Sequence, residues 1–284
     1  MHAKRYFPYL IITPFIVFFT IYRVLPFLAT LYRSIFVVAN STIDFVGLAK
    51  YWDVLSDPLF MKSIINTVII FSILVLIKFP LLFVVSSLVR ESKYKNLFLW
   101  IIYLPVLIGV FAYAIMYRYL FTYNGMLNDL FMKLFNLKID FLGDPLFARV
   151  VVVIALVWSS LGINVLLFVN GLNKIPLEFM EYAEIEGANT IQKLKFIYIP
   201  YTRRLVMTIF FITLIETIGT VVIPLNLTMG GPYQSTYTIG FYMYQQAFQF
   251  GNFPKASAAG VIIFIIGLVV VLVLGKRSSY EKDY

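Results

Sequence analysis

The sequence predicts an all-α protein that crosses a membrane with about six helices. Composition is the first reason: 61% of the 284 residues are hydrophobic and only 13% are charged, with a mean hydropathy of +0.88, whereas soluble chains carry about 25% charged residues. The second reason is a series of apolar runs that reach the roughly 20 residues a helix needs to cross a bilayer core about 30 Å thick. Lipid is therefore the expected solvent for most of the chain.

The composition also excludes several kinds of chemistry. The chain has no cysteine, which excludes disulfides, iron–sulfur clusters and thiol catalysis, and its one histidine, His2, cannot form a metal site or a catalytic triad alone. We therefore expect no catalytic residue, no metal site and no cofactor. The net charge of +9 comes from short basic segments between the apolar runs, so membrane lipid explains it better than nucleic acid.

The first apolar run follows Lys4 and Arg5 but has no small-residue cleavage site, so it is interpreted as a span rather than a signal peptide. The predicted spans are residues 9–32, 64–89, 97–120, 148–172, 205–225 and 256–274. The helices are expected to continue through their internal Pro and Gly residues, because packing in a bundle tolerates them. These residues are Pro14, Pro26, Pro80, Pro105, Gly109, Gly162 and Gly219.

Basic residues predict the orientation, because the cytoplasmic segments of a membrane protein carry an excess of Lys and Arg. One side has Lys4, Arg5, Arg90, Lys93, Lys95, Lys174, Lys193, Lys195, Arg203, Arg204, Lys276, Arg277 and Lys282. The other side has only Lys50, Lys62, Lys133, Lys138 and Lys255. Both termini and the 173–204 loop are therefore expected in the cytoplasm. The expected domains are a helix with an external loop (1–62), a core of five spans (63–275) and a cytoplasmic tail (276–284).

The 173–204 loop carries the signals of a short helix although it lies outside the bilayer. Pro176 suits a first helical position, and Gly187 suits a left-handed C-terminal cap. Acidic residues stand between them, and the earliest favours the positive end of the helix dipole. These residues are Glu178, Glu181, Glu184 and Glu186.

A second helix is expected directly after this glycine turn. Asn189 or Thr190 can cap its start, with Gln192 at capping-box spacing from Asn189, and Pro200 is expected to stop it. The sequence thus predicts a helix, a sharp turn and another helix. From these residues alone, a plain link between two spans remains an alternative.

The same loop resembles the signature of permeases from binding-protein-dependent ABC importers. The motif comprises Glu181-Tyr182-Ala183, then Glu186-Gly187-Ala188, and later Ile199-Pro200. Tyr182, Glu186 and Ile199 stand where Ala, Asp and Leu are usual in the family. The resemblance implies a MetI-like permease fold and a loop that docks in a groove of an ATPase subunit. The loop residues concerned are Glu181, Ala183, Glu186, Gly187, Ala188 and Pro200.

Further segments resemble the carbohydrate branch of that family, the maltose-type permeases. They are Phe45-Val46-Gly47-Leu48 with Tyr51, Asn66-Thr67, residues 141–145, residues 228–232 and residues 244–248. The resemblance implies a homologous second permease, two ATPase subunits, an external solute-binding protein and a bacterial or archaeal cytoplasmic membrane. The chain has no GxxxxGK[ST] phosphate loop, so we expect a non-enzymatic subunit whose partner hydrolyses ATP.

Polar residues within the spans are the candidates for a substrate path. Lys78 and Glu216 lie near the middle of two spans, where a charge costs about 2.5–3.5 kcal/mol, so they are expected either to pair or to contact substrate. Arg23 is a weaker case. In the span 205–225, helical spacing places four polar residues on one face: Thr213, Glu216, Thr217 and Thr220. In the span 148–172, Ser160 lies one turn from Asn164, near Trp158. Packing between helices is the alternative reading of these hydroxyl and amide groups.

Three other functions are alternatives to sugar import. An ABC permease can carry a non-sugar solute such as glycerol phosphate. An ion-coupled secondary transporter would use Lys78 and Glu216 as its coupling pair. A membrane enzyme would need clustered His, Asp or Glu at the membrane surface. The loop signature favours the ABC permease.

Overall fold

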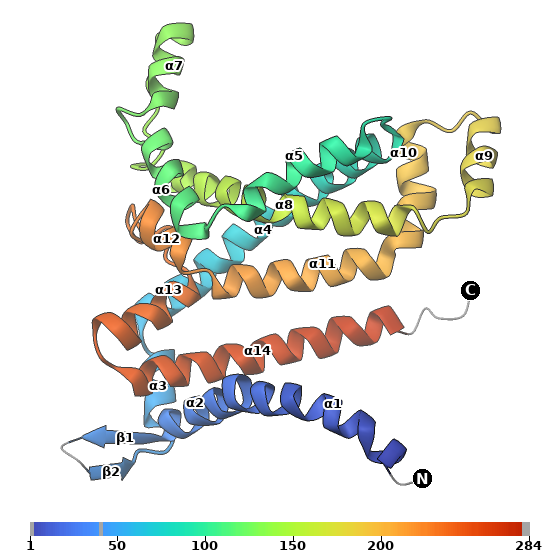
Figure 1. The fold of residues 1–284 in the computed structure, drawn as a ribbon. Helices are drawn as coiled ribbons and strands as arrows, with labels where there is room; N and C mark the ends of the chain where they lie inside the picture. The colour runs from blue at the N-terminus through green and yellow to red at the C-terminus, as the bar shows by residue number, and fades with distance from the viewer. Residues whose placement is uncertain (1–2, 40–41, 280–284) are drawn as a thin grey trace. The chain divides into compact units, whose positions relative to one another are not determined.

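The computed structural model describes residues 3–39 and 42–279, so His2 and the end of the expected tail, residues 280–284, lie outside the described residues. The chain divides into two compact units, residues 1–60 with 242–284 and residues 61–241 (Figure 1). The domain limits expected at residues 62 and 275 stay a prediction, although the last helix continues to Ser279.

The first unit consists of helices and one antiparallel hairpin, and α14 packs along α2 and α3 within it. Its elements are α1 (Ala3–Phe19), the π-helical turn η1 (Thr20–Val24), α2 (Leu25–Ile35), β1 (Phe36–Ala39), β2 (Thr42–Phe45), α3 (Ala49–Leu55), the π-helical turn η3 (Gln245–Gln249) and α14 (Phe253–Ser279). Aromatic contacts join α2 to α14: the rings of Phe27 and Phe264 lie 5.0 Å apart, and Arg33 lies over the ring of Phe253. The two helices therefore form one paired unit.

An ion pair holds the start of α14 in this unit. The Asp57 carboxylate accepts hydrogen bonds from Lys255 Nζ at 2.7 Å, from the Tyr242 hydroxyl at 2.9 Å and from the Leu59 N–H at 2.8 Å. Burial of Asp57 by itself raises its pKa, but the hydrogen bonds and the charge of Lys255 outweigh burial and lower the pKa from its ordinary value. The carboxylate is thus held in its charged form.

The second unit is built around α8, which is buried along most of its length. Its elements are α4 (Pro58–Glu91), α5 (Lys95–Leu107), α6 (Val110–Phe121), α7 (Met126–Phe135), α8 (Pro145–Leu172), α9 (Leu177–Ile185), α10 (Thr190–Lys193), the π-helical turn η2 (Leu194–Tyr198), α11 (Ile199–Gly219), α12 (Val222–Leu227) and α13 (Ile239–Tyr244). Apolar residues of α8 form one cluster with α4, α6 and α12 and a second with α4 and α11. Asp144 caps α8 by accepting from the amides of Leu146 and Phe147.

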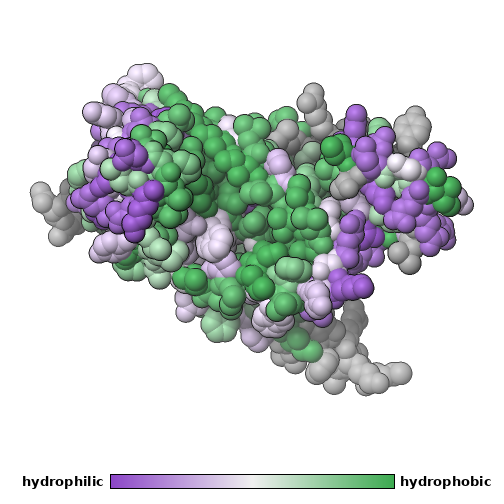
Figure 2. Space-filling view, turned by 90° about the horizontal axis from the view of Figure 1, so that it is seen from above, coloured by the Kyte–Doolittle hydropathy of each residue, from purple (hydrophilic) through white to green (hydrophobic). Residues whose placement is uncertain are grey.

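Within the described residues, five helices are long and apolar enough to cross a membrane, and a bent pair makes a sixth candidate. The five are Ile11–Ile35, Pro58–Glu91, Pro145–Leu172, Ile191–Gly219 and Phe253–Val273. Large apolar side chains lie exposed along them, as expected where lipid replaces water. On the face in Figure 2, hydrophobic residues gather in the middle and hydrophilic residues at two ends. The multi-pass membrane fold is confirmed.

The predicted span 97–120 is not one straight helix. α5 and the helical segment that begins at Val110 meet at 92°, because Ile108 and Gly109 are extended. Pro105 in the last turn of α5 lacks an N–H and weakens the helix just before this break. The helix thus continues through Pro105, as expected, but the expectation that it continues through Gly109 was wrong.

The predicted span 205–225 is also broken, at Gly219. Thr220 is extended, and its carbonyl accepts a hydrogen bond from the Thr238 hydroxyl at 2.8 Å. A Cβ on Gly240 would lie 2.9 Å from the Gly219 carbonyl carbon, so the backbone of α13 approaches too closely for any larger residue. Tertiary contacts thus satisfy the end of α11 inside the membrane-crossing part.

Candidate functional site

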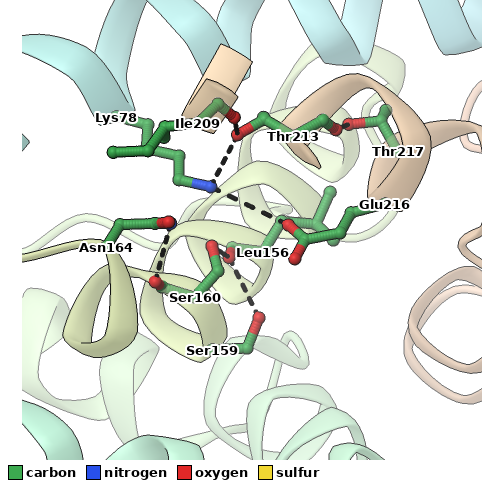
Figure 3. A network of polar contacts seen from close by, with 9 residues as sticks. All are labelled: Lys78, Leu156, Ser159, Ser160, Asn164, Ile209, Thr213, Glu216 and Thr217. Atoms are coloured by element: carbon green, nitrogen blue, oxygen red, sulfur yellow. Dashed lines mark hydrogen bonds and ion pairs between the residues drawn. The ribbon is translucent and has the colours of Figure 1, made fainter. Parts of the chain in front are cut away.

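A polar centre lies between α4, α8 and α11 in the second unit (Figure 3). Lys78 on α4 is fully buried, and its Nζ donates to the Thr213 hydroxyl at 2.9 Å. The same nitrogen lies 3.8 Å from Glu216 Oε2, and the Glu216 side chain is 46% exposed. Lys78 and Glu216 therefore pair, as one of the two predictions for them required. The Glu216 side chain is also partly exposed, so its pairing with Lys78 does not exclude a contact with substrate.

The α11 residues of the centre differ in access. The hydroxyls of Thr213 and Thr217 are buried and donate to the carbonyls four residues earlier, at 2.7 Å each. Glu216 is the accessible member of the predicted stripe. Thr220 lies beyond the end of α11, so helical spacing does not put it on the same face as the others. The stripe therefore has three residues rather than four. The break at Gly219 is the reason.

The α8 residues use their polar groups on their own helix. Ser160 donates to the Leu156 carbonyl at 2.8 Å, and the Asn164 amide donates to the Ser160 carbonyl at 2.8 Å. Ser159, one residue earlier, also donates to Leu156. Figure 3 shows these side chains with the contacts of Lys78 and Glu216. The predicted residues of α4, α8 and α11 are thus brought into one region.

Tyr113 on α6 was missed by sequence reasoning, although it belongs to this centre. Its ring is buried, and its side chain interacts with Ser159 and with the charge of Glu216. One aromatic residue among 28 Phe and 20 Tyr gives no signal of its own. The centre therefore combines a carboxylate, an ammonium, hydroxyls, an amide and an aromatic ring. Among the described residues, no group of three or more His, Cys, Asp or Glu can hold a metal ion.

The helical loop is the second candidate site, and its turn follows the prediction closely. α9 ends at Ile185, and Gly187 two residues later lies in the left-handed region (φ +69°). Glycine adopts this conformation without strain because it has no Cβ. The Gly187 N–H donates to the Glu184 carbonyl at 3.0 Å, and the Ala188 N–H to the Ala183 carbonyl at 2.8 Å. These bonds satisfy the last carbonyls of α9. Pro176 stands directly before α9 rather than at its first position.

The second helix of the loop begins with the predicted capping box. The Gln192 N–H donates to Asn189 Oδ1 at 2.9 Å, and the Asn189 N–H donates to Gln192 Oε1 at 2.7 Å. Pro200, however, does not stop the helix, which runs from Ile191 to Gly219. The wider π-helical turn η2 ends at Tyr198, two residues before Pro200, and reduces the clash of the proline ring with the preceding turn. The prediction of a stop at Pro200 was wrong.

Several apolar side chains of the loop are exposed to solvent. Tyr182 is 69% exposed, Ile185 80% and Ile191 75%. Glu181 and Glu186 are also exposed. A polar segment with such apolar side chains has the composition of a docking surface.

Comparison with known proteins identifies the family. Residues 3–278 match the family described as "Binding-protein-dependent transport system inner membrane component". The chain belongs to this family.

Curated relatives of this permease cover nearly its whole length. It is 28% identical to the "Lactose transport system permease protein LacF" of Rhizobium radiobacter, over 95% of this chain and 93% of the relative. It is 27% identical to the "Arabinooligosaccharides transport system permease protein AraP" of Bacillus subtilis (strain 168), over 99% and 91%. Both relatives are permease subunits by name.

A solved structure has the same fold. It is a "bacterial alginate ABC transporter in complex with alginate pentasaccharide-bound periplasmic protein", with a TM-score of 0.85, 20% identity and coverage of 99% of this chain and 96% of that chain. The expectation of an ABC importer permease fold is confirmed.

Sequence reasoning also missed Arg149 in the first turns of α8. Its Nε donates to the Ser235 carbonyl at 2.9 Å and its Nη2 to Asn66 Oδ1 at 3.0 Å. The Asn66 amide in turn donates to the carbonyls of Gln234 and Tyr237. In the permease this network joins α4, α8 and the loop 228–238, which contains the Gly-Gly-Pro motif. A charge at the start of a predicted apolar span was the available signal.

Proposed function

We propose that this permease carries a saccharide into the cytoplasm of a bacterium or archaeon by ATP-driven alternating access. The observation that carries the proposal is the half-exposed Glu216 carboxylate within a membrane-crossing helix, beside hydroxyls, an amide and Tyr113. Saccharides need convergent hydrogen-bonding groups and an apolar or aromatic surface. The names of the relatives, which refer to lactose and arabinooligosaccharides, support a sugar as cargo.

Within this site the residues have different roles. Lys78 and Thr213 are buried and in contact, so they orient Glu216 rather than meet the cargo first. Glu216 accepts hydrogen bonds from sugar hydroxyls. The α8 side, with Ser160 and Asn164, forms the opposite wall. Thr217 is buried on the same helix, and the half-buried Thr220 just beyond the helix end continues the path.

The loop couples this site to ATP hydrolysis in a partner chain. α9, with Glu181, Ala183 and the Gly187 turn, docks on the ATPase subunit, and Ala188 and Pro200 belong to the same loop. A continuous helix, Ile191–Gly219, extends from this loop to Glu216. A movement of the docked loop is therefore transmitted along one rigid helix to the sugar site. This continuity supports the loop as a lever better than two separate helices would.

The complete importer contains this chain, a homologous second permease, two ATPase subunits and an external solute-binding protein. Both termini and the loop 173–204 face the cytoplasm, in agreement with the basic residues there. ATP binding and hydrolysis supply the bias between the inward-open and outward-open states, so the sugar itself need not prefer one of them.

The test is ATP-dependent uptake by the complete importer in proteoliposomes, with the binding protein loaded from a panel of saccharides and glycerol phosphate. We expect saccharide uptake that Glu216→Ala lowers at least tenfold and that Asp53→Asn, an exposed surface change, leaves intact. Uptake of glycerol phosphate but no saccharide would replace the proposed cargo. Uptake driven by an ion gradient without ATP would overturn the ABC mechanism in favour of a secondary transporter.

A further inference from the structure

A cavity of 350 Å³ lies between the end of α8 and the start of α11, beside the helical loop. It lies within the second unit, and its lining includes no residue of the polar centre, so it is not the proposed sugar site. Its polar rim comprises Asn170, Lys174, Tyr201 and Arg204, and Leu167 and Leu205 contribute apolar walls. A cationic rim on an apolar wall matches an amphiphile with an anionic head.

In the part of the chain that the structure describes, no carboxylate neutralises the two basic residues of this cavity. Among the described residues, neither Lys174 nor Arg204 has a carboxylate within ion-pair distance, whereas Lys193 in the same loop pairs with Glu184 at 3.0 Å. Both basic side chains are exposed. An ammonium and a guanidinium that converge on one cavity can share the oxygens of a phosphate, and the fork of Arg204 can bind two of them.

The apolar side of the cavity continues towards the membrane interior. Leu167 is exposed, and so is Ile163 one turn before it on the same face of α8. These side chains lie on a helix that crosses the membrane, so an acyl chain can follow them from the cavity. A free phosphate would gain nothing from this apolar strip.

We propose that the cavity binds the phosphate head of an anionic phospholipid, with Lys174 and Arg204 on the phosphate and the Leu167 face against an acyl chain. Basic pockets between membrane helices commonly hold such heads. The bound lipid links α8 to the helix that carries both the docking loop and Glu216, so it stabilises the lever at its base. The inference stands whether or not the transported solute is a sugar.

The test counts bound lipids by native mass spectrometry on the complete importer during titration with phosphatidylglycerol or phosphatidylcholine. We expect one tightly bound phosphatidylglycerol per copy of this chain and about 25-fold weaker binding after Lys174→Gln with Arg204→Gln, since each basic residue contributes about 1 kcal/mol. The matched control, Lys195→Gln with Arg203→Gln, removes two charges from the same end of the protein and keeps the site.

Three results would overturn the proposal. They are equal binding of the two lipids, equal loss in the control variant, and displacement of the lipid by millimolar inorganic phosphate, which would mean a phosphate site without an acyl contribution. The exchange Lys174→Arg with Arg204→Lys preserves both charges. Retained lipid binding in this variant supports the proposal even where the glutamine variant is poorly folded, and lost binding counts against it.

Discussion

Two lysine–glutamate pairs in this permease lie in opposite environments. In the polar centre, Lys78 Nζ is 3.8 Å from Glu216 Oε2, and the lysine is fully buried. In the helical loop, Lys193 Nζ is 3.0 Å from Glu184 Oε1, and the glutamate is 68% exposed. The longer contact is nevertheless the more important one. Water solvates the loop charges whenever the pair opens, but if Glu216 is lost, the buried Lys78 ammonium keeps its hydrogen bond to Thr213 and loses its counter-charge.

The comparison teaches that burial, rather than distance, decides how much an ion pair contributes. It also separates the tasks of the two regions. The centre keeps a charge inside the membrane-crossing part, whereas the loop is shaped by local caps and leaves apolar side chains exposed.

The largest effect is expected for Glu216→Gln, which leaves a buried ammonium without its counter-charge. We expect a loss of about 3 kcal/mol in the free energy of unfolding, measured in mild detergent. Lys78→Met leaves only a half-exposed carboxylate, so its cost should stay within about 1 kcal/mol. The double variant should recover most of the Glu216→Gln loss. Equal losses of unfolding free energy in the two single variants would contradict the argument that the buried lysine depends on its partner more than the glutamate does.

A partly buried pair at the ends of two spans gives the next effect. Asp57→Asn removes the charge that Lys255 and Tyr242 contact, and we expect a cost of about 1–3 kcal/mol at pH 7. The folded-state pKa of Asp57 is lowered, so its stabilisation is present above its unfolded pKa of about 4 and is lost as pH falls through the lower folded value. The difference from wild type should therefore shrink below about pH 4. Asp53→Asn is the control, since Asp53 pairs with Lys50 at the surface.

The glycine turn of the loop is expected to show a smaller effect. Gly187→Ala places a Cβ at φ +69° with no atom within 4 Å, so strain alone costs about 1 kcal/mol. We expect this strain to speed hydrogen exchange in α9 and to weaken copurification of the ATPase subunit. Gly267→Ala, in a regular helix and also without contacts within 4 Å, should have no such cost. An unchanged loop in Gly187→Ala would mean that its conformation does not depend on glycine.

The smallest effect is expected for Lys193→Gln, which breaks the shorter pair. Exposed pairs contribute about 0.2–1 kcal/mol, and added salt screens them. We expect a change in unfolding free energy below about 0.5 kcal/mol, smaller still in high salt. A loss as large as that of Glu216→Gln would contradict the burial argument.

Much of the fold follows from local sequence signals. Five spans, the capping box of Asn189 and Gln192, and the left-handed turn at Gly187 were all predicted. Each depends on residues within a few positions of one another, so pattern and spacing are sufficient. The candidate residues at membrane depth were also found this way, because a charge in an apolar run is visible without any structure.

The errors lie where two distant segments meet. Proline and glycine by themselves do not say whether a helix breaks: it bends after Pro105, continues through Pro200 and ends at Gly219. At Gly219 the helix ends because Thr238 and Gly240 contact the backbone there. Arg149 and Tyr113 were missed because their partners lie far away in the sequence.

The sequence by itself thus determined that this chain is a multi-pass membrane protein with a capped helical loop, because hydropathy and capping are properties of neighbouring residues. The resemblance of that loop to a permease signature indicated the family. Only the tertiary structure decided that Lys78 pairs with Glu216, which is 138 positions later in the chain, and that one helix joins the loop to that pair. Those features depend on how α4 and α11 pack, and packing between distant helices cannot be read from the order of residues along either one.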